Sequence, residues 1–107
     1  MALVIPELQS LIQQTAVSFS TSGDQTVVAA LANKTTRILQ LFLVIGGTTN
    51  LIFKSGATAL TGTLTFSSGA MFMDYIHLSM DCLQGGAFII NSSQAVTVGG
   101  TVWYVQQ

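Results

Sequence analysis

TRILQLFLVI, residues 36–45, carries the strongest strand pattern in the chain, and Gly46-Gly47 directly after it marks where the strand ends. In a two-layer sandwich, a strand normally alternates between apolar residues that face the core and polar residues that face water. Here both faces of the predicted strand are largely apolar. One face carries Leu39, Leu41, Leu43 and Ile45, and the other carries Ile38, Gln40, Phe42 and Val44.

Two explanations fit this apolar excess. Either a loop or the N-terminal segment covers the second face, or that face packs against another copy of the chain. The closing strand has the same property, because Val102 and Tyr104 share one side while Trp103 and Val105 share the other. We favour a second copy, because interfaces between identical subunits are more apolar than free surfaces and are enriched in aromatic residues. The candidate interface residues are Leu39, Leu41, Phe42, Leu43, Val44, Val102, Trp103 and Tyr104.

From residue 24 onward, the chain consists of short apolar or β-branched runs separated by Gly, Ser, Asn and Thr. Roughly eight runs recur at a spacing of about ten residues, which is typical of antiparallel sandwiches and jelly rolls. The sequence therefore predicts a single all-β domain over residues 24–107, folded as an antiparallel β-sandwich or jelly roll. The expected strands are Thr26–Leu31, Thr36–Ile45, Asn50–Lys54, Thr63–Phe66, Met71–Met80, Ala87–Asn91, Gln94–Val98 and Thr101–Val105.

The first 23 residues have a different pattern. Pro6-Glu7 precedes Leu8, Leu11 and Ile12, which fits one or two helical turns with proline at the first helical position. An extended arm that lies on a neighbouring subunit fits the same residues, and so does an edge strand of the sandwich. We assign residues 1–23 to an N-terminal arm or helical segment.

Charged residues are scarce. The chain has three Lys or Arg and four Asp or Glu among 107 residues, with a formal net charge of −1, whereas about a quarter of a typical domain is charged. Nucleic-acid binding depends on clustered Lys and Arg, so we exclude it as the main activity. A neutral surface gives little charge repulsion between molecules. This composition favours a protein that works inside an assembly.

Neither a membrane span nor a secretory signal is expected. The longest apolar stretch, residues 38–45, is far shorter than the roughly twenty residues of a transmembrane helix. The N-terminus lacks the basic region of a signal peptide. Cys82 is the only cysteine, so no intrachain disulfide is possible, and a free thiol suits synthesis in a reducing cytoplasm.

One segment resembles a catalytic site in composition. In an extended strand, Tyr75, His77, Ser79 and Asp81 share a face. Same-face neighbours stand about 7 Å apart and project in parallel, whereas a catalytic triad needs side chains that converge to about 3 Å. His77, Asp81 and Cys82 also lack the paired spacing of a metal site. We expect no catalytic, metal or cofactor site, although His77 at a subunit contact would make assembly pH-dependent.

Several motifs resemble a known group of proteins. They are the basic residue that opens the apolar strand at Arg37, Phe-Lys-Ser-Gly at 53–56, Ala-Leu-Thr-Gly at 59–62, and Val-Gly-Gly-Thr-Val-Trp-Tyr-Val at 98–105. From about residue 26 onward, the chain resembles small all-β virion proteins of tailed bacteriophages. The segment around residues 74–82 departs from that pattern.

The resemblance implies a structural protein without enzymatic residues. Such a protein would be made in the host cytoplasm and would decorate the capsid surface as a cement protein. It would form a homo-oligomer, with a trimer favoured, and it would bind the major capsid protein. The alternative is a tail-fibre or head-fibre tip that binds host-surface glycans through exposed Trp103, Tyr104 or Tyr75.

Overall fold

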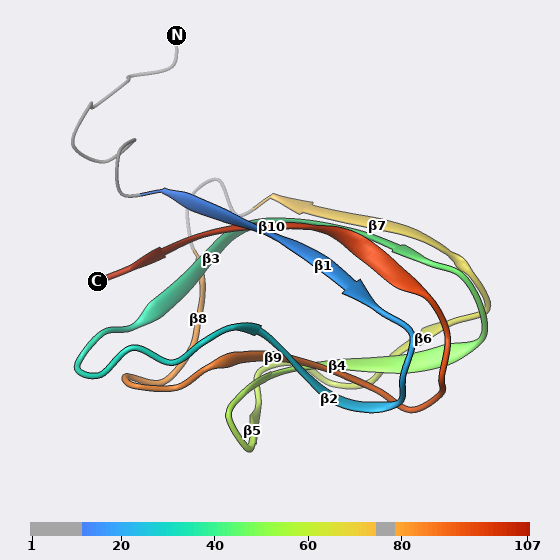
Figure 1. Cartoon of the computed structure of the whole chain (residues 1–107), viewed down its shortest axis with the longest axis horizontal. Helices are drawn as coiled ribbons and strands as arrows, with labels where there is room; N and C mark the ends of the chain where they lie inside the picture. The colour runs from blue at the N-terminus through green and yellow to red at the C-terminus, as the bar shows by residue number, and fades with distance from the viewer. Residues whose placement is uncertain (1–11, 75–78) are drawn as a thin grey trace, which may run out of the picture.

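The computed structural model describes residues 12–74 and 79–107 and places them in two antiparallel β-sheets that pack face to face (Figure 1). The expectation of an all-β sandwich is confirmed. The described residues form ten strands, and they contain no helix that could cross a membrane.

The first sheet contains the strand that the sequence singles out. Its strand order is β1-β10-β3-β7. The short strand β8 pairs with the same edge of β3 as β7 does, further along β3. The strands are β1 (Gln13–Phe19), β10 (Val98–Gln106), β3 (Thr36–Ile45), β7 (Gly69–Asp74) and β8 (Met80–Asp81). The observed bounds of β3 match the predicted ones.

The second sheet lies beneath the first (Figure 1). Its strand order is β2-β9-β4-β5, and β6 pairs with β4. The strands are β2 (Gly23–Val28), β9 (Phe88–Ser92), β4 (Thr49–Ser55), β5 (Thr58–Ala59) and β6 (Leu64–Phe66).

The N-terminal boundary needs correction. Residues 13–19 form β1 and pair with β10 at the sheet edge, so the edge-strand alternative holds for them. Pairing with β10 places Val17 in the core, where it is buried. The sandwich therefore begins before residue 24. The helical turn predicted after Pro6 falls largely in residues 1–11, which lie outside the described residues.

Two other predicted strands also differ. Residues 94–97, within the predicted strand Gln94–Val98, form no strand, and β10 begins only at Val98. Buried hydroxyl groups hold this connection: Thr49 Oγ1 accepts from the Gln94 N–H at 3.1 Å, and Ser92 Oγ donates to the Gln94 carbonyl at 2.8 Å. Of the predicted strand Met71–Met80, residues 71–74 belong to β7 and Met80 belongs to β8, while residues 75–78 lie outside the described residues.

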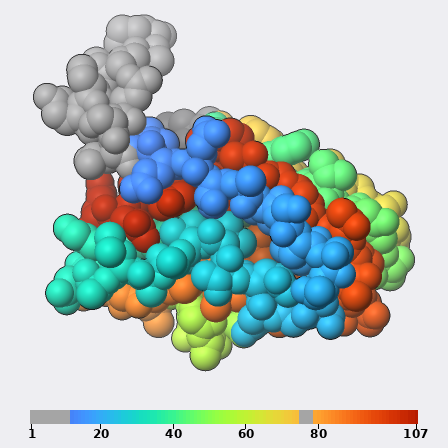
Figure 2. Space-filling view, viewed as in Figure 1, coloured from blue at the N-terminus to red at the C-terminus, as the bar shows by residue number. Residues whose placement is uncertain are grey.

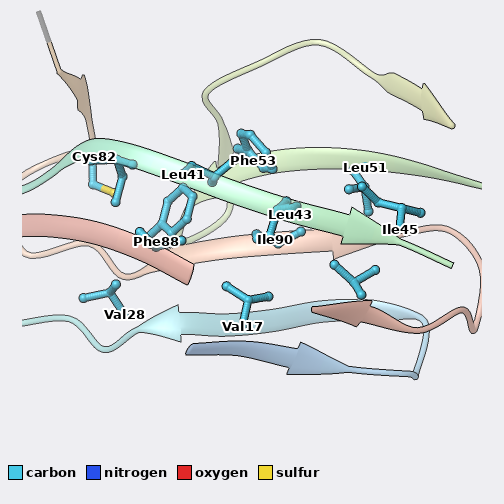
Figure 3. Packing of buried hydrophobic residues seen from close by; sticks show 13 residues of the cluster. Val17, Val28, Leu41, Leu43, Ile45, Leu51, Phe53, Cys82, Phe88 and Ile90 are labelled. Carbon is cyan, nitrogen blue, oxygen red and sulfur yellow. The ribbon is translucent and has the colours of Figure 1, made fainter. Parts of the chain in front are cut away.

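The core lies between the sheets and is built from inward-facing residues of both (Figure 3). The Phe53 and Phe88 rings are tilted against each other with centroids 5.8 Å apart. Burying a large apolar side chain of this kind stabilises a fold by about 1.5–3 kcal/mol. The buried cluster comprises Val17, Val28, Ile38, Leu41, Leu43, Ile45, Leu51, Phe53, Cys82, Phe88, Ile90, Val98 and Val102.

Candidate interaction surface

A β-bulge at Leu39 explains why both faces of β3 read as apolar. Gln40 pairs with Trp103 and Ile38 pairs with Tyr104, so Leu39 is the extra residue between them. An extra residue shifts the two-residue alternation by one position. Residues 36 and 38 therefore face the core before the bulge, and residues 41, 43 and 45 face it afterwards. The two faces predicted from strict alternation are wrong across this point.

The predicted interface residues consequently separate into three groups. Leu41, Leu43 and Val102 are fully buried in the core, so they are corrected from interface to core residues. Figure 3 shows Leu41 and Leu43 among core side chains of the second sheet. Phe42 and Val44 alternate with them and point outward, with 38% and 47% of their surface exposed.

The remaining three candidates are half-buried. Leu39 occupies the bulge. Trp103 Nε1 donates to Gln14 Oε1 at 3.2 Å, on the strand next to it. The Tyr104 hydroxyl donates to Gln13 Oε1 at 3.1 Å, and its ring packs against the core. Gln13 and Gln14 therefore fix both aromatic rings at the start of β1.

Sheet register brings Phe42 and Val44 into two continuous outward rows. The first row is Ala16, Thr101, Phe42 and Phe72, and the second is Ser18, Gly99, Val44 and Ala70. We call these eight residues the neutral patch. None of them carries a charge. Phe72 is 61% exposed, so this patch displays two phenylalanines and a valine in the open.

A third row borders the patch and is more polar. It consists of Gln14, Trp103, Gln40 and Asp74 on successive strands. The outward face of the first sheet thus changes from apolar to polar along the strand direction.

The outer face of the second sheet differs sharply from the neutral patch. Lys54 Nζ lies 3.1 Å from both carboxylate oxygens of Asp24, and Asn91 Nδ2 donates to Asp24 at 2.7 Å. The Asn91 hydrogen bond, followed by the Lys54 hydrogen bond, lowers the pKa of Asp24 below its ordinary value. Half-buried Ile52 and Ile89 share this outer face, which therefore mixes apolar side chains with an ion pair that the neutral patch lacks.

The segment that resembled a catalytic site has structural partners where it is described. Arg37 Nη1 lies 2.5 Å from Asp81 Oδ2, and the Ser79 hydroxyl donates to the same carboxylate. Cys82 is buried in the core, and burial raises the pKa of its thiol. Tyr75 and His77 lie outside the described residues. No group of three or more metal-ligating side chains occurs in residues 12–74 and 79–107.

No family model, curated protein or solved structure matches this chain.

Phe72 is the functional candidate that sequence reasoning missed. The alternation in β7 offered a signal: one face carries Ala70, Phe72 and Asp74, and the other carries Met71 and Met73. Which set faces outward depends on the pairing of β7 with β3, where Phe72 lies opposite Phe42. That pairing cannot be read from β7 alone.

Proposed function

We propose that this protein is a structural component of a phage virion, a capsid decoration protein that works as a homo-oligomer. The neutral patch carries the proposal. It is an exposed apolar area on a regular sheet, and it contrasts with the ion-paired outer face of the other sheet. Exposed apolar patches of this kind mark interaction sites.

The physical chemistry of the patch favours contact with another copy of the chain. Around the symmetry axis of a homo-oligomer, the same residues of each chain approach one another, and charges of one sign would repel there. The patch contains no charge to repel. Covering the exposed parts of Phe42, Val44 and Phe72 contributes about 1 kcal/mol for each side chain. The resemblance of residues 37–66 and 98–105 to virion proteins favours a trimer that binds the major capsid protein.

Reconstitution on phage heads tests this function. Heads that lack the protein are incubated with the purified chain and imaged by cryo-electron microscopy. We expect extra density at regular sites on the capsid lattice, in clusters that match the oligomer in solution. Density on a fibre, or heads that bind none of the added chain, would contradict the proposal.

Glycan binding is the second candidate, and the polar row supports it. Trp103 lies between Gln14 and Gln40, with Asp74 at the end of the row. An aromatic ring flanked by amides and a carboxylate offers both an apolar surface and hydrogen-bonding groups for a sugar. A glycan-array signal that Trp103→Ala abolishes would favour a fibre-tip role over capsid decoration.

A further inference from the structure

The edge strand β1 has one unused side. All seven of its residues pair one to one with β10, without a register shift. No other described strand pairs with its opposite side, because β1 ends the sheet. Figure 2 shows β1, in blue, running along the near surface of the molecule. The backbone N–H and C=O groups on that side form a regular template for another strand.

The other edges of the sandwich carry features that hinder strand pairing. β2 contains Asp24 and has an irregular register near Thr26. β5 is only two residues long. β7 ends in Asp74. Charges, bulges and short length all discourage pairing at an edge. β1 has seven residues and none of these features.

We propose that β1 pairs antiparallel with β1 of a second copy, around a two-fold axis at Ala16. Ala16 is the central residue of the strand, so this register pairs all seven residues. Gln14 would then lie opposite Ser18 of the other copy, and Thr15 opposite Val17. Registers centred elsewhere leave residues at the strand ends without partners.

The side chains of β1 suit this register. The smallest one, Ala16, meets its own copy at the axis, where a large group would collide with itself. Thr15 opposite Val17 is a pair of β-branched residues, and such cross-strand pairs stabilise antiparallel sheets. The strand carries no charge, so no like charges meet. A charged partner would find no complementary group on β1.

The contact would extend the sheet across two molecules. Ala16 and Ser18 belong to the neutral patch, so the patches of the two copies would become continuous. A two-fold contact differs from the contact that closes a trimer, and the two together would link oligomers into a network. This inference goes beyond the proposed function and does not depend on the neutral patch being buried.

Disulfide trapping tests the register. In an antiparallel pair, Cα atoms of opposed residues stand about 4.5–5.5 Å apart, which falls within the range that a disulfide spans. Ala16→Cys should form a covalent dimer under mild oxidation, at least about ten-fold faster than the exposed control Thr65→Cys. Cross-linking should stop at two chains, because each chain carries one accessible thiol beside the buried Cys82.

A mixing experiment makes the test specific. Gln14→Cys alone and Ser18→Cys alone should give little dimer, whereas an equal mixture of the two should cross-link readily. Circular dichroism and thermal unfolding check that each variant folds as the wild type does. An Ala16→Cys variant that cross-links no faster than Thr65→Cys would overturn the proposal. A mixture that cross-links no better than its components would overturn it as well.

The test is separable from the proposed function. Adding Phe72→Ser to the Ala16→Cys variant should leave cross-linking intact, since Phe72 lies on β7 at the opposite edge of the sheet. If Phe72→Ser weakens the oligomer of the proposed function, the β1 dimer should still form and be trapped by the disulfide.

Discussion

A side chain on Gly100 would overlap the carbonyl oxygen of Phe42, because β10 and β3 approach closely at this point. Gly100 also has a φ of +155°, which residues with a side chain rarely adopt. The same approach places Thr101 beside Phe42 in the neutral patch. Gly100 thus connects core packing with the geometry of the proposed interface.

Gly100→Ala should destabilise the fold by about 3 kcal/mol or more, since the backbone would have to move to admit the methyl group. Gly99→Ala is the matched control. A methyl group there meets its nearest neighbour, the Val17 carbonyl oxygen, at an ordinary 3.8 Å. Urea unfolding of both variants measures the difference. Equal unfolding free energies for the two variants would contradict the observed strand geometry.

A buried hydroxyl pair holds the end of the sandwich near Gln94. Thr49 Oγ1 and Ser92 Oγ are 2.7 Å apart, and the Ser92 proton goes to the Gln94 carbonyl, so Thr49 donates to Ser92. Thr49→Val keeps the shape but leaves the Gln94 N–H without its acceptor, which should cost about 1–3 kcal/mol. Thr65→Val, at an exposed position of β6, should change the unfolding free energy by less than about 0.5 kcal/mol.

Acid should weaken the fold partly through Asp24. Its pKa is lowered in the folded protein, so its contribution to stability is present above the unfolded pKa and is lost as the pH falls through the folded pKa. The unfolding midpoint of the wild type should therefore fall more steeply below about pH 4 than that of Asp24→Asn. The carboxylate is 46% exposed, so added salt should reduce the difference. Parallel pH profiles would show that Asp24 does not contribute.

Cys82 should react slowly with thiol reagents in the native protein. Its side chain is buried in the core, and the raised pKa keeps the thiolate population low at neutral pH. Absorbance after addition of an aromatic disulfide reagent measures the rate, which should increase at least about a hundred-fold in denaturing urea. In Ala16→Cys, one thiol should react fast and the other slowly. Rapid native reaction of the wild type would mean that Cys82 is accessible.

Local pattern predicted those parts of the fold that depend on a single strand. The bounds of β3 followed from its alternation and the glycines after it, and the sandwich class followed from the spacing of the runs. The bulge at Leu39 could not be predicted, because apolar residues on both sides of it hide the shift in alternation. Only the pairing of Gln40 with Trp103 and Ile38 with Tyr104 reveals it.

The candidate surface was predicted only in part, because the bulge at Leu39 hides which residues of β3 face outward. Phe42 and Val44 were identified from their strand, while Leu41, Leu43 and Val102 were assigned to the wrong side. For residues 13–19 the sequence left a helix, an arm and an edge strand open, and only the pairing with β10 decides for the edge strand. The errors on β3 and β10 concerned which face a residue occupies, and that is decided by pairing between distant strands.

The mass of the protein in solution tests most directly whether the neutral patch joins identical chains. Light scattering at micromolar concentration should give a discrete multiple of the 11.3 kDa chain mass. Phe72→Ser should weaken association about ten-fold, which corresponds to about 1.4 kcal/mol, whereas Leu83→Ser should leave it unchanged. Leu83 is a fair control, because it is 57% exposed and lies outside the patch. A wild-type mass of a single chain, or equal association of the two variants, would contradict the role that we assign to this face.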